Sequence, residues 1–478
     1  MELVATDFDN SDHKGDDNNT LLPSSPSSST NNGEVDLNEV LDSIPVGVFH
    51  YRLLLICGLS FMADAMEVSL LSFLSPCVSA DWNLSDAETA SITSVVFAGI
   101  LVGSVFWGPL ADTRGRRRAF IYGSSMIIIG GFLSAFCPDY ATFIICRAVV
   151  GFGVGGISVP FDLLAEYLPN EYRGKFLMYI EYFWTIGSMF VAGSAWIILS
   201  QGGDWRALTL VTAAPVTIGL AVSICYLPES PRYLIEQGRL DEAAQALRAV
   251  AEVNGHPWKP VTLKATPGSL HSHSSMGAIR QLLQSDQIRV TVAVWIVWLS
   301  FGFSYYGLIL FVARVFEHNE EADDLNGDEE TCDFEYNEIF VSAASEVVGV
   351  TLTAVVIDRW GRVGTQSFMY ACAGISTILM GINLPSAARL SMSIMARSTA
   401  MGAASATWVA NPELYPTESR ATAHAIANSI SHLGGFLCPY LIDSSAVTNG
   451  AIGAILGSVS LLAAVVVLAT PETLGKNL

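Results

Sequence analysis

A chain of 478 residues with only 14% charged residues and a mean hydropathy of +0.43 differs from soluble proteins, in which about a quarter of residues are charged. Its net charge of −21 comes largely from two acid-rich segments, residues 1–50 and 315–338, and neither resembles a surface that binds phosphate. Composition therefore predicts a protein embedded in a lipid bilayer and excludes nucleic acid as a partner.

The N-terminal segment has the composition of a disordered tail. Residues 1–50 contain ten acidic residues and one lysine, and residues 24–30 read SSPSSST. A secretory signal needs a basic start followed by an apolar core, and this segment has neither. We expect residues 1–48 to form an acidic tail on the cytoplasmic side of the membrane.

Apolar residues gather in twelve blocks of roughly 20 residues, the length that a helix needs to cross about 30 Å of hydrocarbon. Lipid tolerates only helices or closed barrels, and no block has the alternating pattern of a barrel strand. The expected spans are 51–78, 87–110, 118–137, 141–165, 175–200, 206–227, 289–314, 338–357, 364–384, 389–410, 421–442 and 447–470. The fold class is therefore an all-α membrane protein with twelve transmembrane helices.

Short basic loops orient the chain, because Lys and Arg near span ends are retained on the cytoplasmic side. Arg114 and residues 116–118 follow span two, Arg173 follows span four, and Arg359 and Arg362 follow span eight. All of these loops leave even-numbered spans. Both termini should therefore face the cytoplasm, with residues 315–338 outside the cell or in a lumen.

The sequence contains an internal repeat. EYLPNEYRG at 166–174 recurs as ELYPTESRA at 413–421, PES at 228–230 recurs as PET at 471–473, and Asp112 corresponds to Asp358. The three offsets of 243–247 residues place six spans between equivalent points, so the two halves share one orientation. We expect six-helix bundles at 49–228 and 289–470, a cytoplasmic linker with an amphipathic helix at 229–288, and a cytoplasmic tail at 471–478.

These motifs together are similar to those of a known family. GPLADTRGRRR at 108–118, IDRWGR at 357–362, the paired ExxPxxxR motifs and PESPR at 228–232 resemble the major facilitator superfamily, in its sugar-porter and organic-ion branch. MADAMEVSLLSFL at 62–74 and FSYYGLILF at 303–311 resemble the synaptic vesicle two-related subfamily and its niacin transporter relatives. The resemblance implies two pseudo-symmetric bundles that alternate in exposing a central cavity.

The resemblance also implies a cytoplasmic gate built from charged residues at the loops of both halves. Such ties would stabilise one state and break as the halves rock, although a purely structural role explains the same residues. The gate candidates are Asp112, Arg116, Arg117, Glu166, Arg173, Asp358, Arg362, Glu413 and Arg420.

Charged residues inside a span cost about 2.5–3.5 kcal/mol each, so each demands a partner or a water-filled cavity. Asp64 and Glu67 lie three residues apart on one helical face, where they form a candidate pair for carrying a proton or receiving a cation. The alternative is that they hydrogen-bond to neighbouring helices or to Arg147, which resembles a family residue for proton coupling and carboxylate binding. Glu181 and Glu346 could line the cavity, and Arg397 repeats Arg147 at an offset of 250.

Aromatic residues in span seven suggest a binding surface. Tyr305 and Tyr306, flanked by Gly302 and Gly307, predict a broken helix that could clasp a flat ring, although ordinary packing explains them as well. His432 in span eleven could relay protons or could be a hydrogen-bonded neutral side chain. GFGVGG at 151–156 matches a dinucleotide fingerprint, but inside a span its glycines predict close helix packing instead.

The remaining motifs concern the external face. Asn83 in Asn83-Leu84-Ser85 is a candidate for glycosylation, and Cys332 could pair with Cys77 or Cys137 or stay a free thiol. No cofactor or metal site is expected, and no spacing of nucleophile and base indicates an enzyme.

The predicted function is secondary active, proton-coupled symport of a small organic ion by a monomer in a plasma membrane or an endomembrane such as that of a vesicle or vacuole. A nicotinate-like carboxylate bound by Arg147 or Arg397 is the first expectation. The alternative solutes are an organic cation that faces the acidic residues, or a sugar. The alternative class of protein is a membrane protein that binds a metabolite or nucleotide without transporting it.

Overall fold

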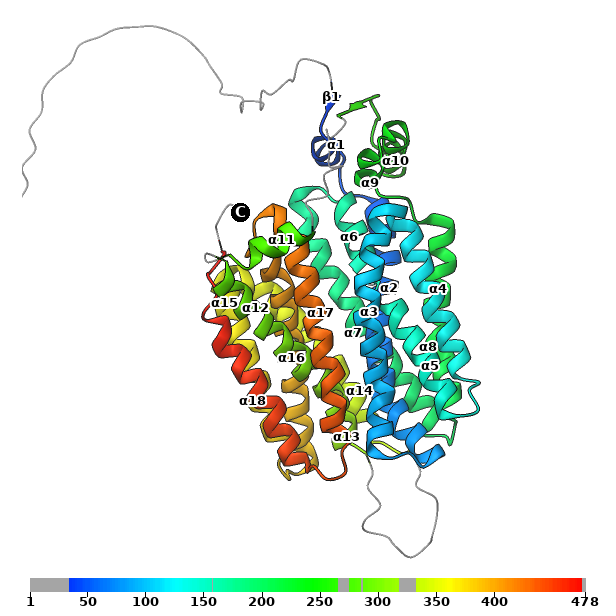
Figure 1. The fold of residues 1–478 in the computed structure, drawn as a ribbon, viewed down its shortest axis with the longest axis vertical. Helices are drawn as coiled ribbons and strands as arrows, with labels where there is room; N and C mark the ends of the chain where they lie inside the picture. Colours follow the sequence, from blue (N-terminus) through cyan, green and yellow to red (C-terminus); the bar gives the residue numbers. More distant parts are fainter. Residues whose placement is uncertain (1–33, 157, 265–274, 285–286, 318–331, 475–478) are drawn as a thin grey trace, which may run out of the picture. The chain divides into compact units, whose positions relative to one another are not determined.

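Helices dominate the chain from the end of the N-terminal tail to its C-terminal residues (Figure 1). The computed structural model describes residues 34–156, 158–264, 275–284, 287–317 and 332–474. The first 33 residues of the predicted tail and most of the acid-rich segment, 318–331, lie outside the described residues, as do 265–274 in the linker and 475–478 at the C-terminus.

Six helical passes form the N-terminal half. Their apolar sequences suit lipid, where a helix satisfies the hydrogen bonds of its own backbone without water. The passes are α2 (Val48–Trp82), α3 (Asp86–Arg114), α4 (Arg116–Ser134), α5 (Tyr140–Val154) with α6 (Ser158–Tyr167), α7 (Asn170–Leu199) and α8 (Trp205–Tyr226).

Six passes form the C-terminal half in the same order. One helix, α15 (Glu346–Met380), supplies parts of two passes because its backbone turns at Gly361, where φ is 79°. The passes are α12 (Ile288–Phe301) with η1 (Gly302–Tyr306) and α13 (Gly307–Val315), α14 (Tyr336–Ala344) with the first part of α15, the second part of α15, α16 (Ser386–Glu413), α17 (Thr417–Ile442) and α18 (Asn449–Val467).

Within the described residues, nine helices or joined helices are long and apolar enough to cross a membrane by length and composition alone. The remaining passes arise because α14 and α15 make two passes within one continuous stretch, and because α4 and α16 fall short in apolar composition. α4 starts with three arginines, and α16 carries Arg389 and Arg397. The predicted twelve-helix fold is confirmed.

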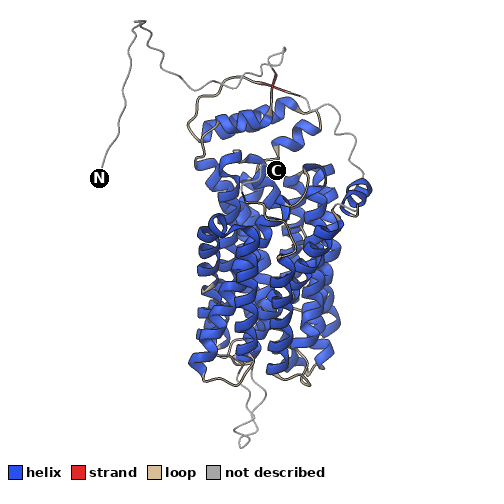
Figure 2. Ribbon diagram, turned by 90° about the vertical axis from the view of Figure 1, so that its left-hand side faces the viewer, coloured by secondary structure: helices blue, strands red, loops and turns tan. Residues whose placement is uncertain are grey.

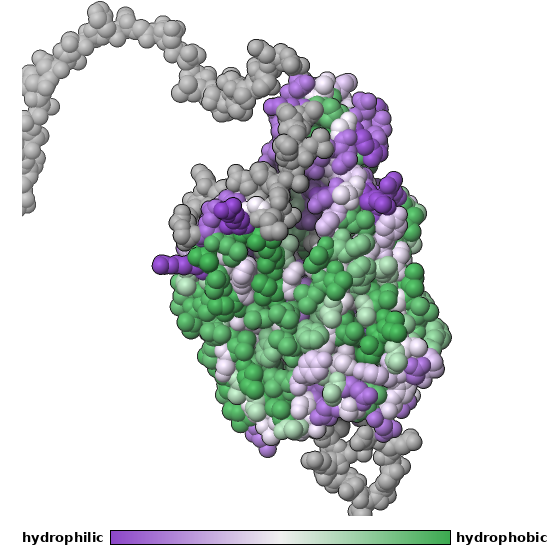
Figure 3. Space-filling view, viewed as in Figure 1, coloured by the Kyte–Doolittle hydropathy of each residue, from purple (hydrophilic) through white to green (hydrophobic). Residues whose placement is uncertain are grey.

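Large apolar side chains cover the outer surface of the bundle. Val105 is 72% exposed, Ile197 is 66% exposed and Val465 is 65% exposed, all within predicted spans. Figure 3 shows hydrophobic residues over the flanks of the helices and hydrophilic residues at the ends. Exposed apolar surface of this extent is unfavourable in water and matches a lipid-facing belt, so the chain is a multi-pass membrane protein.

Side-chain caps set where many of the helices start. Ser85 and Glu88 form a capping box at α3, in which the Ser85 N–H donates to Glu88 Oε2 at 2.9 Å.

Pro169 precedes α7 and Pro416 precedes α17 with nearly the same backbone angles, ψ 147° and ψ 150°. The recurrence 247 residues apart shows that the internal repeat seen in the sequence is also a structural repeat.

Close helix contacts explain the GFGVGG segment. A Cβ added to Gly151 in α5 would lie 2.1 Å from the Val96 carbonyl oxygen of α3, closer than any side chain allows. In the other half, a Cβ on Gly349 would lie 1.9 Å from the Ser398 carbonyl oxygen of α16. The sequence interpretation of close packing rather than nucleotide binding is therefore confirmed.

Short linker helices lie at one end of the bundle (Figure 1 and Figure 2), two of them above the long helices and one beside their ends. They are α9 (Pro231–Glu236), α10 (Leu240–Val253) and α11 (Ser275–Leu282), together with strand β2 (Thr262–Leu263). Ser230 caps α9 by accepting from the Tyr233 N–H at 3.0 Å, with Pro231 at the first helical position. We call this end the linker side and the opposite end the far side.

The segment just before α2 differs from the predicted tail. Residues 34–48 contain strand β1 (Glu34–Val35) and helix α1 (Leu37–Ser43), and Asp42 accepts from the Asn170 N–H at 3.0 Å. Asn254 after α10 accepts from the Phe49 N–H at 2.9 Å. These long-range hydrogen bonds and the buried side chains of Val40, Leu41 and Ile44 hold the segment against the linker side.

Candidate functional site: a central acidic and aromatic cavity

A small cavity lies where α2 and α7 of one half meet η1, α16 and α17 of the other. Its enclosed volume is about 20 Å³, room for a single water molecule rather than a solute. Solute entry therefore requires the two halves to move apart. The cavity is lined by Phe61, Asp64, Glu181, Trp184, Phe301, Tyr305, Tyr306, Met401, Ala404, Trp408, Asn428 and His432.

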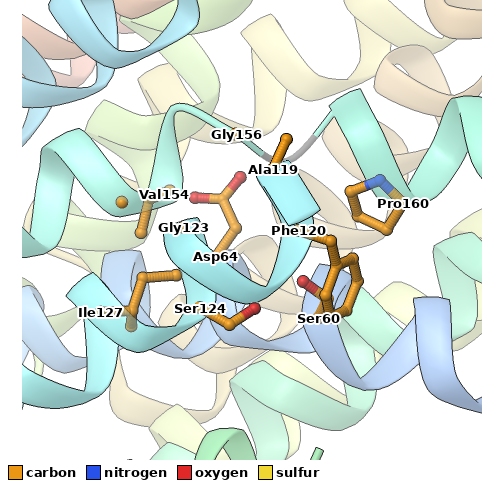
Figure 4. Close-up of a pocket in the computed structure, with 11 residues that line it drawn as sticks. Ser60, Asp64, Ala119, Phe120, Gly123, Ser124, Ile127, Val154, Gly156 and Pro160 are labelled. Carbon is orange, nitrogen blue, oxygen red and sulfur yellow. The ribbon is translucent and has the colours of Figure 1, made fainter. Parts of the chain in front are cut away.

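Two carboxylates of the N-terminal half face this cavity without a partner. Asp64 on α2 and Glu181 on α7 are each 5% exposed, and neither forms a hydrogen bond or ion pair with any residue that the structure describes. Asp64 also borders a second cavity of about 10 Å³, where Figure 4 shows it with Ser60 and Ser124 between α2 and α4. A buried charge without a partner is costly, so these carboxylates are suited to bind a proton or a cation.

The predicted pairing of Asp64 with Glu67 does not form. Glu67 forms an ion pair with Arg147 of α5 and borders a different cavity, of about 30 Å³. The two acids occupy one helix three residues apart, but they face different neighbours. Of the two partners open to Arg147 from the sequence, the structure selects Glu67.

The second buried arginine is also neutralised. Arg397 Nη2 on α16 lies 2.6 Å from Glu346 Oε1 on α15, and the Tyr305 hydroxyl donates to the same oxygen at 3.2 Å. Glu346 is fully buried and Arg397 is 3% exposed. Neither residue lines the central cavity, so the expectation that Glu346 faces it differs from the structure.

Aromatic rings form most of the cavity wall. Phe301 stacks on Tyr305 with ring centroids 5.5 Å apart, and Trp184 approaches Tyr305 at 6.0 Å. Tyr306 stacks on the His432 ring at 6.1 Å. Aromatic faces carry negative electrostatic potential and attract cations, so the walls reinforce the negative charge of Asp64 and Glu181.

The helix that carries the two tyrosines is continuous instead of broken. Residues 302–306 form one π-helical turn, η1, with helical angles at both Gly302 and Gly307. Gly302 is required because an added Cβ would lie 1.8 Å from the Ser431 carbonyl oxygen of α17. A π turn re-aims side chains inside a helix and recurs at functional sites, and here it presents Tyr305 and Tyr306 together.

The linker side of the N-terminal half contains a charged cluster. Arg116 Nη1 donates to Asp112 Oδ1 at 2.6 Å, and Arg116 Nη2 lies 3.4 Å from Glu166 Oε1. The Arg117 N–H donates to Glu229 Oε1 at 3.1 Å. Arg116 thereby joins the ends of three helices, and Glu229 holds the start of α4.

The C-terminal half repeats the cluster contact by contact. Arg362 Nη1 donates to Asp358 Oδ1 at 3.0 Å, and its Nε and Nη2 donate to both oxygens of Glu413 at 2.9 Å and 3.0 Å. The backbone N–H groups of Arg362 and Val363 donate to Glu472 at 3.0 Å. Bidentate Arg–carboxylate geometry makes this cluster the better defined of the two.

Two glycines are needed for the repeated cluster. Gly115 and Gly361 have φ values of 101° and 79°, which other residues rarely adopt. A Cβ at these positions would lie 2.2 Å from Glu229 Oε2 and 2.3 Å from Glu472 Oε2. The glycines therefore allow the two glutamates to approach the turn closely.

Two predicted gate residues stand apart from these clusters. The Arg173 Nε is buried with no hydrogen-bond partner among the described residues, because Glu166, the acid of the same ExxPxxxR motif, pairs with Arg116. Arg420, the counterpart of Arg173, donates to the Tyr415 carbonyl at 3.4 Å. The spacing that placed both arginines in the motif carries no information on which acid each one meets.

The far side joins the two halves. Asp86 at the start of α3 accepts from the N–H and hydroxyl of Ser445 at 2.6 Å and 2.8 Å, and the Ser94 hydroxyl donates to the Phe436 carbonyl at 2.8 Å. Cys77 and Cys332 form a disulfide, which selects one of the pairings left open by the sequence. Asn83, the glycosylation candidate, lies on this side as the exposed C-cap residue of α2.

Several residues of the site were not foreseen. Phe61, Met401, Trp408 and Asn428 line the cavity, and the only sequence signal for them is position, since Phe61 precedes Asp64 by nearly one turn. Glu229 and the matching Glu472 were visible as a repeated motif without a role. Within the described residues, no group of three or more His, Cys, Asp or Glu side chains comes together as a metal site.

Two six-helix halves around a buried charged cavity define a membrane transporter of the major facilitator type. Residues 31–478 match the family model described as "Sugar (and other) transporter". The chain belongs to this family, which confirms the resemblance seen in the sequence and the expectation that it is not an enzyme.

The similar proteins include animal, plant and bacterial transport-family members. The synaptic vesicle 2-related protein of Rattus norvegicus is 31% identical over 416 residues, covering 85% of this chain and 75% of that protein. Organic cation/carnitine transporter 7 of Arabidopsis thaliana is 30% identical, covering 85% of this chain and 88% of that protein. A partially occluded inward-open structure of the xylose transporter XylE from E. coli has a TM-score of 0.71 and 18% identity, covering 90% of this chain and all of that one.

Proposed function

We propose that the chain is a secondary active transporter of small organic cations that works by alternating access. The observation that carries this proposal is the charge of the central cavity: two carboxylates, Asp64 and Glu181, lack partners, while both nearby arginines are already paired with acids. A cation that enters this cavity meets uncompensated negative charge and aromatic faces.

A nicotinate-like carboxylate, the first expectation from the sequence, fits this arrangement less well. It would need Arg147 or Arg397 to release its glutamate, and breaking a buried ion pair leaves a charge uncompensated. A sugar would meet few polar amides, since Asn428 is the one amide side chain in the described cavity lining. The name of the Arabidopsis relative, which includes organic cations, also favours the cation.

Proton coupling is the second part of the proposal. A proton and a cationic solute would each neutralise the same buried carboxylates, so their binding is linked through Asp64 and Glu181. Because both ligands neutralise the same carboxylates, an imposed proton gradient should change the uptake of the cation.

The membrane orientation is likewise proposed. The basic loop residues Arg114, Arg116, Arg117 and Arg118 lie on the linker side, which supports a cytoplasmic location for that side and for both termini. A disulfide on the far side is typical of an oxidising compartment, which supports a luminal or extracellular location there. The name of the rat relative, synaptic vesicle 2-related protein, supports a location in an endomembrane.

The test is uptake into proteoliposomes that contain the purified protein, with radiolabelled tetraethylammonium, choline, nicotinate and xylose, with and without a proton gradient. We expect saturable uptake of tetraethylammonium or choline, at a rate higher than that of nicotinate or xylose. Saturable uptake of nicotinate alone would contradict the cation proposal. Binding without counterflow would favour the alternative of a membrane protein that binds a ligand without transporting it.

A further inference from the structure

The disulfide on the far side connects the two halves of the transporter. Cys77 belongs to α2, the first pass of the N-terminal half, and lies 4% exposed near the end of that helix. Cys332 lies just before α14 in the C-terminal half, and the two Cα atoms are 5.1 Å apart. The bond spans 255 residues of sequence, so it is a covalent link between bundles and not a local loop staple.

Cys332 is firmly attached to its own half. Two residues later, Phe334 pairs with Glu317 in an antiparallel bridge, and the Glu335 N–H donates to the Phe316 carbonyl at 2.8 Å. Phe316 follows α13 directly, and α14 begins at Tyr336. Two residues of extended chain reach at most about 7 Å, so the attachment leaves little slack between Cys332 and α13.

The other contacts between the halves on this side are noncovalent. Phe73 of α2 meets the Phe334 ring at 5.2 Å and the Tyr336 ring at 6.4 Å, and Asp86 binds Ser445. Individual contacts of these kinds contribute about 0.5–3 kcal/mol and break and re-form during a conformational change. A disulfide does not open thermally on that time scale, so it limits how far α2 and α13 can separate.

We infer that the Cys77–Cys332 disulfide is a redox-controlled restraint that limits how far the far side of the transporter opens. This inference rests on the alternating-access part of the proposed function. While the bond is intact, the cavity can open to the linker side, but opening to the far side is restricted. Once the bond is reduced, only noncovalent contacts hold that side together.

The switching reaction is thiol–disulfide exchange with a dithiol. One thiolate of the dithiol attacks a sulfur of the disulfide and forms a mixed disulfide, and its second thiol then displaces the protein sulfur. The protein gains two electrons and two protons to become the Cys77 and Cys332 thiols, while the dithiol is oxidised to its cyclic disulfide. The other six cysteines are free thiols and take no part.

The test compares the oxidised and dithiothreitol-reduced forms of the full chain in nanodiscs by hydrogen–deuterium exchange. Alkylation of the denatured protein first establishes each form, since the oxidised chain exposes six thiols and the reduced chain eight. Reduction should make backbone amides of residues 70–84 and 436–448 exchange about tenfold faster, because the far side opens. No substrate is needed, so the result is independent of whether a cation is transported.

Two variants control the experiment. Cys77→Ala combined with Cys332→Ser should exchange like reduced wild type with or without dithiothreitol. Cys225→Ser, which removes an exposed free thiol, should respond to dithiothreitol as wild type does. Eight reactive thiols in protein isolated under oxidising conditions would overturn the inference. A change confined to residues 332–336, with 436–448 unaffected, would also overturn it, because the bond would then only fix its own segment.

Discussion

The two halves of this transporter are alike on the linker side and unlike at the centre. Arg116 and Arg362 make the same pair of acid contacts, and Glu229 and Glu472 hold the same turns. At the cavity, however, the N-terminal half supplies the unpaired carboxylates and the C-terminal half supplies most of the aromatic wall. The charged turns are therefore alike in the two halves, whereas the two halves line the cavity with different side chains.

The arginine pairs show the same contrast in a milder form. Each half buries one arginine against one glutamate, but Glu67 and Arg147 border a cavity of about 30 Å³, whereas Glu346 and Arg397 are enclosed and receive the Tyr305 hydroxyl. Water can reach the first pair when that cavity fills. The second pair is therefore the stronger candidate for a structural role.

The largest expected effect is the loss of stability when the enclosed pair is broken. Arg397→Met leaves Glu346 buried without a counter-charge, and such changes cost about 3–5 kcal/mol. Thermal unfolding in detergent, followed by intrinsic fluorescence, should show a large fall in Tm. The double variant Glu346→Gln with Arg397→Met should recover much of the loss, and Glu67→Gln should cost less. A double variant no more stable than Arg397→Met would contradict the assignment.

The next effect concerns the unpaired acids. Asp64→Asn keeps the shape of the side chain but removes its charge, and we expect uptake driven by a proton gradient to fall about 100-fold, equivalent to roughly 2.7 kcal/mol of lost interaction. Ser124→Ala changes the cavity behind Asp64 without removing a charge and serves as the matched control. Unchanged uptake by Asp64→Asn in protein with wild-type expression and Tm would refute its role in coupling.

A smaller effect tests the aromatic wall. Trp408 lies on α16, with its ring centroid 5.8 Å from that of Phe161 in the other half. Trp408→Leu should weaken cation binding about fivefold to tenfold, because a ring face contributes about 1 kcal/mol to a cation, whereas Trp408→Phe should retain most of the affinity. Apparent KM for counterflow measures this change. Trp360→Leu, which alters an exposed tryptophan on α15, should leave KM unaltered.

The smallest effect tests the duplicated turns. Glu229→Gln and Glu472→Gln should each lower stability by about 1 kcal/mol, since each removes charge from hydrogen bonds donated by backbone N–H groups. A loss confined to one half would show that the two clusters are not equivalent. The free energy of unfolding of both variants is measured by chemical denaturation under the same conditions.

The Glu472 contribution should also depend on pH. Burial raises the pKa of Glu472, but N–H groups of Leu474, Arg362, Val363 and Thr473 outweigh it and lower the pKa below its ordinary value of 4.5. A lowered pKa stabilises the folded state above that value, and the stabilisation disappears as the pH falls through the folded pKa. The difference between wild type and Glu472→Gln should therefore be full at pH 7 and shrink in acid. A difference that grows in acid would contradict this account.

Local sequence patterns were sufficient for the architecture. Spans such as 87–110 and 141–165 lie within the observed α3 and α5–α6, because a bilayer imposes a length and an apolar composition that one segment reveals by itself. The repeated motifs showed which residues correspond between the halves. The linker helix α10 and the Ser230 cap followed from local chemistry in the same way.

Local patterns could not predict which distant side chains pair. Asp64 and Glu67 share a helix face by periodicity, yet Asp64 faces the central cavity and Glu67 meets Arg147, since neighbouring helices differ on each side of that face. The pairing of Glu166 with Arg116 and the position of Trp408 in the cavity wall depended on how α4, α6 and α16 are placed. Cys332 had two possible partners until the far side was assembled.

The sequence alone determined that this is a duplicated twelve-helix membrane protein, because hydrophobic length and repeat offset are properties of one segment or of two compared segments. Only the tertiary structure decided which charges are neutralised and which stay free in the cavity, because an ion pair is set by the distance between side chains on different helices. That distinction changed the favoured solute from an anion to a cation.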